Sequence, residues 1–178
     1  MEKTTLFIDT ETTGLLDFRS PMRADHQPWP VQIAFIEMLG DRVMGSMNFI
    51  VRPPVAIPKK ASDIHGITDE ISDEYGLTIR QSAVIVRNAV RRAGIVVAHN
   101  AVFDTAILEA LNLRVFKDYE PLEWPCIFCT MVESSPLLNL PPTDRMKAVG
   151  FNKPKPPKLE EAIRFFFDED LSGAHDEM

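Results

Sequence analysis

Several features that would assign a protein to a class at once are scarce in this sequence. It has only two cysteines, Cys126 and Cys129, too few for a disulfide scaffold and half the ligands of a four-cysteine zinc site. No apolar run approaches the roughly 18 residues that a membrane-spanning helix needs. The N-terminus, MEKTT, has no signal-peptide pattern. We therefore expect a cytoplasmic protein with reduced thiols and no membrane partner.

Positive charge is also in short supply. The chain has 19 Lys and Arg against 26 Asp and Glu, which gives a formal net charge of −7 at pH 7. Tight, passive binding of nucleic acid usually leaves a basic footprint, and this balance argues against it. An enzyme that holds an acidic substrate through metal ions is still compatible, because its acids would belong to the site.

The sequence does contain a regular order of strand and helix patterns over 178 residues, enough for one domain with a sizeable core. Three apolar runs near the N-terminus predict an antiparallel meander, and strand and helix patterns alternate after it. Strands are expected over 4–9, 31–39, 43–51, 95–100 and 124–129, and the main helices over 78–93, 102–112 and 158–167. This order predicts an α/β fold with a mixed five-stranded sheet flanked by helices, in a single domain over 1–178. Between the first two strands, the polar, proline-containing stretch 16–30 predicts a long loop, of a length that is usually either functional or disordered.

Two carboxylates, Asp9 and Glu11, end the first strand in the run LFIDTETTGLL. Residues i and i+2 of a strand share one face, so these side chains would lie about 7 Å apart. Like charges at that distance cost free energy unless something compensates them, and a pair of divalent cations would do so. Asp104, one turn into the helix after strand 95–100, would join them if that strand pairs with the first.

Such an acidic cluster is typical of two-metal phosphodiester hydrolysis. Two Mg²⁺ ions roughly 3.5–4 Å apart clamp the attacking and leaving oxygens. Mg²⁺ prefers hard oxygen ligands, which Asp and Glu supply. A neutral histidine can then accept the proton of the attacking water, and His175 near the C-terminus is the candidate.

Four segments resemble the motifs of the DEDDh 3′–5′ exonucleases, the family of the DNA polymerase III proofreading subunit, ribonuclease T and oligoribonuclease. They are FIDTETTG (7–14), DIHGIT (63–68), VVAHNAVFD (96–104) and GAHDEM (173–178). The resemblance implies a ribonuclease H-like sheet and two divalent cations, Mg²⁺ or Mn²⁺. It also implies release of nucleoside monophosphates from the 3′ end of a single strand. DNA is the first choice of substrate, because the polymerase-associated branch is the more similar one.

The same resemblance implies a role for each matching residue. Asp9 would bridge both cations, Glu11 and Asp104 would each hold one of them, and His175 would be the general base. The residues expected to contact the terminal nucleotide are Thr12, Gly14, Leu15, His65, Asn100 and Phe103.

One departure from the family pattern concerns the last motif. The family's final acid follows its histidine by five positions, and this chain ends three residues after His175. We therefore expect a chain truncated within that motif, with weak metal binding and impaired activity; a natural form with weakened metal binding is the alternative. Two other functions stay open: a nuclease-fold module that docks on a DNA polymerase with little catalysis, and a ribonuclease that trims small RNAs. A homodimer is a further possible assembly.

Overall fold

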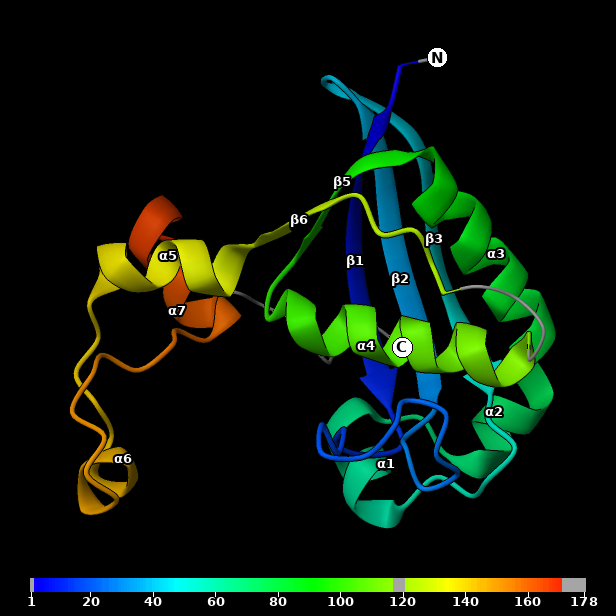
Figure 1. Ribbon diagram of the computed structural model, residues 1–178, viewed down its shortest axis with the longest axis horizontal. Coiled ribbons are helices and arrows are strands. Elements are labelled where there is room, and N and C mark those ends of the chain that lie inside the picture. Colours follow the sequence, from blue (N-terminus) through cyan, green and yellow to red (C-terminus); the bar gives the residue numbers. More distant parts are fainter. Residues whose placement is uncertain (1, 117–120, 171–178) are drawn as a thin grey trace.

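The computed structural model describes residues 2–116 and 121–170, which form a mixed sheet with helices around it (Figure 1). Within these ranges the strand order is β4–β3–β2–β1–β5–β6. The strands are β1 (Thr4–Thr12), β2 (Pro30–Leu39), β3 (Arg42–Arg52), β4 (Leu77–Thr78), β5 (Ala93–Ala98) and β6 (Cys126–Cys129). β1, β2 and β3 are antiparallel neighbours, whereas β5 runs parallel to β1 and β6 parallel to β5. The predicted meander followed by parallel strands is confirmed.

Two details of the sheet differ from the expectation. β4 is a sixth strand of two residues, whose backbone pairs with the end of β3. β6 begins at Cys126 rather than at position 124, because Pro125 has no N–H for the ladder and the backbone N–H of Trp124 donates to the carbonyl of Leu122 instead.

Seven helices occur in the described ranges: α1 (Lys59–His65), α2 (Asp69–Tyr75), α3 (Ile79–Arg92), α4 (Ala101–Val115), α5 (Thr130–Leu138), α6 (Asp144–Ala148) and α7 (Leu159–Phe167). α3 begins with a capping box, in which the side chains of Thr78 and Gln81 each bond the other's backbone N–H. None of the seven has the length and apolarity needed to cross a membrane.

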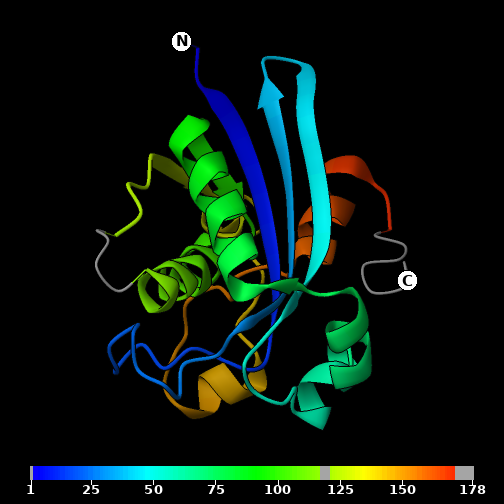
Figure 2. The same cartoon turned by 90° about the vertical axis from the view of Figure 1, so that its right-hand side faces the viewer.

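Helices α3 and α4 cover one face of the sheet (Figures 1 and 2). Leu6 and Ile8 of β1 pack there in one apolar cluster with Phe35 of β2, Val86 of α3 and Leu108 of α4. The alternation of buried and more exposed positions along β1 follows from the two-residue period of a strand. Helices α5, α6 and α7 lie beyond β6 (Figure 1).

The relative lengths of β1 and β5 decide where the chain can build a site. The pairing of β1 with β5 ends at Phe7 and Val97, whereas β1 continues to Thr12. After β5 the backbone of Asn100 adopts a left-handed conformation, φ 67°, which asparagine tolerates better than most residues. The chain therefore turns within two residues, and the first turn of α4 lies beside the unpaired edge of β1.

Candidate active site

The last residues of β1 present two acids on one side of the strand. Thr10 is buried, whereas Asp9 is exposed and Glu11 half-buried. The two carboxylates thus leave β1 on the face opposite to Thr10. The register between β1 and β2 slips between Glu11 and Thr12, an irregularity that often re-aims side chains beside an active site.

Asp104 approaches this strand end from the first turn of α4. Its side chain is 4% exposed, and its Oδ1 accepts a hydrogen bond of 2.8 Å from Thr10 Oγ1. The backbone N–H of Thr10 also interacts with the carboxylate. This approach is possible because β5 has already ended at Ala98 and no longer occupies that edge of β1.

The electrostatics of Asp104 are unfavourable to its charged form. Burial, opposed by the hydrogen bond from the Thr10 hydroxyl and assisted by the negative charge of Asp9, raises the pKa of Asp104 from 3.8 to about 7. A nearby cation would offset both the lost hydration and the repulsion between the two carboxylates. This arrangement is the first reason to regard the strand end as a cation site.

The donor set fits a hard divalent cation in its chemistry, since Asp9, Glu11 and Asp104 offer carboxylate oxygens only. Among the described residues, no three His, Cys, Asp or Glu side chains are close enough together to hold one ion. His175, the predicted general base, lies outside the described residues. Of the predicted catalytic residues, the structure therefore describes Asp9, Glu11 and Asp104.

Three of the predicted nucleotide contacts lie directly after the acids. Thr12 Oγ1 donates a hydrogen bond of 2.6 Å to the carbonyl of Gly14, which closes a tight turn at the end of β1. Leu15 follows with 88% of its surface exposed. An apolar side chain left so open at a strand end is available to pack against a ligand.

The other three predicted contacts come from two helices. Asn100 is exposed at the start of α4, and Phe103 is half-buried in its first turn, next to Asp104. His65 ends α1 and is buried, and its Nδ1 accepts a hydrogen bond of 3.1 Å from the N–H of Ile67. When neutral, the ring therefore carries its proton on Nε2. α1 lies at the same end of the sheet as the tip of β1 (Figure 1).

The loop between β1 and β2 is more ordered than its polar sequence indicated. Gln27 is 1% exposed, and its amide bonds the backbone of Asp17 in both directions. Arg114, in the last turn of α4, donates to the carbonyls of Gln27 and Pro28. Its guanidinium carbon lies 3.6 Å from the centre of the Trp29 ring. Sequence reasoning missed this support, because 85 residues or more separate Arg114 from the loop.

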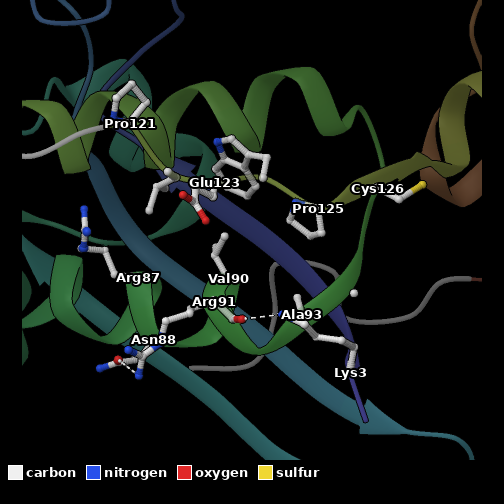
Figure 3. A pocket seen from close by; sticks show the side chains of 13 residues that line it. Lys3, Arg87, Asn88, Val90, Arg91, Ala93, Pro121, Glu123, Pro125 and Cys126 are labelled. Carbon is white, nitrogen blue, oxygen red and sulfur yellow. Dashed lines mark hydrogen bonds between the residues drawn. The ribbon is translucent and has the colours of Figure 1, made fainter. Parts of the chain in front are cut away.

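A hollow of about 690 Å³ lies at the end of the sheet opposite to the acids of β1 (Figure 3). It is lined in part by Lys3, Arg87, Arg91 and Trp124, and Lys3 Nζ donates to the carbonyl of Arg91 over 3.0 Å. Lys3 precedes β1, and Asp9 lies six positions further along the chain, a distance of about 20 Å in an extended strand. This hollow is therefore not part of the acidic site.

The chain is similar to known exonucleases in its sequence and in its fold. Residues 6–141 match the family model RNase_T, described as exonuclease. Among solved structures, *E. coli* Exonuclease I in complex with a dA16 oligonucleotide superposes with a TM-score of 0.73 at 22% identity, over 99% of this chain and 38% of that chain. The zinc-bound form of the E. coli Exonuclease I–single-stranded DNA complex gives a TM-score of 0.71 at 21% identity, over 99% of this chain and 37% of that chain.

A curated relative is the uncharacterized exonuclease CP81 of *Escherichia* phage 186, 34% identical over 108 residues. The match spans 61% of this chain and 48% of the phage protein, so the chain covers about half of that relative's length. Fold and family together define a nuclease with the ribonuclease H-like fold of Exonuclease I. The chain belongs to the exonuclease family, which confirms the resemblance seen in its motifs.

Proposed function

We propose that this protein is a metal-dependent 3′–5′ exonuclease that releases nucleoside monophosphates from single-stranded DNA. The observation that carries the proposal is the buried Asp104 held by Thr10 beside Asp9, within a chain of the exonuclease family. Single-stranded DNA is favoured as substrate because *E. coli* Exonuclease I, whose fold this chain shares, has been solved with dA16 and dT13 oligonucleotides.

In this proposal Asp9, Glu11 and Asp104 hold two divalent cations, Mg²⁺ or Mn²⁺. When bound, these cations would compensate the charge that builds up on the phosphodiester during attack by water. Asp9 would serve both cations and the other two acids one each. Thr10 holds the Asp104 carboxylate beside Asp9 through its hydroxyl, so a partner of the proposed ligand is already in place.

The remaining residues act on the strand and on the proton. Thr12, Gly14 and Leu15 would approach the terminal nucleotide, while His65, Asn100 and Phe103 would hold its sugar and base. An aromatic ring suits this role because every base has a π-face. His175 would take the proton from the attacking water, the task of a neutral histidine near pH 7.

The test is a cleavage assay on 5′-labelled single-stranded DNA and RNA of one sequence, with Mg²⁺, Mn²⁺ or EDTA. We expect a ladder that shortens from the 3′ end of DNA, is absent in EDTA and is lost in Asp9→Ala. Asp41→Ala is the matched control, because Asp41 is exposed in the turn between β2 and β3 and should leave cleavage unchanged.

Other outcomes would redirect the proposal. Preferred shortening of the RNA would replace DNA with RNA as the substrate. Absence of cleavage by a folded protein with either metal would refute the enzyme and favour a module that docks on a polymerase. The same assay on a chain extended past Met178 tests whether a further acid raises activity.

A further inference from the structure

A cavity of about 300 Å³ adjoins the predicted nucleotide contacts. One wall is the turn Thr13–Leu15, a second is formed by Pro28 and Trp29, and a third includes Val55 and Pro58 of the segment that leads into α1. Its volume is at the lower limit of roughly 300–1,000 Å³ for small-ligand pockets. It therefore has room for one flat group rather than for a length of chain.

The walls suit a nucleobase. They combine the Trp29 indole, two prolines and the side chains of Leu15 and Val55, of which Leu15 is 88% and Val55 46% exposed. Every base has a π-face, so aromatic and apolar side chains can pack against a base whatever its identity. Leu15 belongs both to this cavity and to the predicted contacts of the terminal nucleotide, so the two places are neighbours.

The cavity is held open by contacts that reach across the molecule. The backbone N–H of Thr13 donates to the carbonyl of Trp29 over 2.9 Å, and the N–H of Trp29 donates to Thr13 Oγ1 over 3.0 Å. These two bonds join the turn after β1 to the backbone of Trp29, whose side chain forms the second wall. Arg114 covers the ring of Trp29 and donates to the carbonyls of the two preceding residues. A wall fixed before the ligand arrives costs less ordering on binding.

We propose that this cavity holds the base of the nucleotide next to the 3′-terminal one, and that Arg114 is a positioning residue that keeps its Trp29 wall in place. The inference rests on the proposed function, since it presumes that a single strand ends at Asp9 and Asp104. It adds a second base position, which lets the protein grip a strand rather than a free mononucleotide.

The chain offers a direct spectroscopic test, because Trp29 and Trp124 are its two tryptophans. A Trp124→Phe variant reports fluorescence from Trp29 alone. It is titrated with the tetranucleotide dT4 in Ca²⁺, and with dT4 that lacks the base next to the 3′ end. A gel verifies that the oligonucleotides stay intact, and anisotropy of 5′-labelled strands measures binding independently. We expect intact dT4 to quench Trp29, and the abasic strand to bind with a Kd about tenfold higher and without quenching.

Two variants examine the wall. Trp29→Leu should raise the Kd of dT4 about tenfold and leave that of dTMP unchanged, whereas the matched Trp124→Leu should change neither. Arg114→Lys keeps the charge and loses the planar fork. It should raise KM for oligonucleotides several-fold, with kcat and the circular dichroism spectrum unchanged.

Each outcome decides between the hypotheses. Binding of dT4 by anisotropy with unchanged Trp29 fluorescence, or equal affinity of the abasic strand, overturns the cavity while the proposed exonuclease stands. Failure of the folded protein to bind any strand overturns both. A fall in kcat at constant KM in Arg114→Lys contradicts its role as a positioning residue for the strand.

Discussion

The pH dependence of stability should report the burial of Asp104 directly. Its pKa is about 7 in the folded protein against 3.8 as the ordinary value. Between these values the native state holds the proton more tightly than the unfolded chain, so ionisation favours unfolding. The stabilising effect of the protonated acid is complete below pH 3.8 and is lost as pH rises through 7. A difference of about 3 pKa units corresponds to about 4 kcal/mol in the free energy of unfolding.

Urea unfolding in EDTA at pH 5, 6, 7 and 8 measures this effect, with wild type compared with Asp104→Asn. The difference in the free energy of unfolding between the two proteins isolates the effect of Asp104. From pH 5 to pH 8 we expect wild type to lose up to about 3 kcal/mol of stability relative to the variant. Asp41→Asn, at an exposed turn, should follow wild type at every pH. Mg²⁺ should reduce the loss of wild-type stability at high pH, since a cation favours the charged carboxylate. A constant difference between wild type and Asp104→Asn would refute the buried, proton-holding acid.

Three other substitutions test separate parts of the structure. Thr10→Val removes the hydroxyl that holds Asp104 and should lower kcat at least tenfold, a loss of about 1.4 kcal/mol or more, with a smaller effect on KM. Arg92→Ala leaves the buried Glu37 carboxylate without its two hydrogen bonds and should cost about 2–3 kcal/mol in urea unfolding, with cleavage unchanged. Leu108→Ala opens the core beneath α4 and should cost about 2–5 kcal/mol, and a cost below 1 kcal/mol would mean that this helix is loosely packed.

The local patterns in the sequence were sufficient to predict the sheet plan and most helices. The 3.6-residue period in α3 indicated an apolar stripe of four residues, of which Ala83, Val86 and Val90 are buried and Ile79, the first, is half-buried. The strand predicted over 95–100 ends at Ala98, because Asn100 turns the chain into α4. The strand β4 depends on an alignment with β3 that two residues cannot encode locally.

The candidate site was proposed from residue types alone, whereas its contacts needed the structure. Asp9, Glu11 and Asp104 stood out because acids at strand ends are costly without a purpose. The bond between Thr10 and Asp104 joins residues 94 positions apart and needs the sheet order to be known. Arg114 had no motif at all, since its partners are backbone carbonyls and an indole face that any loop could present.

The early end of β5 links activity to stability in this fold. If β5 continued two residues further along β1, it would gain ladder hydrogen bonds and close the edge through which Asp104 reaches Thr10. Substitutions that regularise this edge should therefore give a more stable protein that lacks the proposed nuclease activity. A search for thermostable variants would select against the active site unless the turn at His99 and Asn100 is held constant.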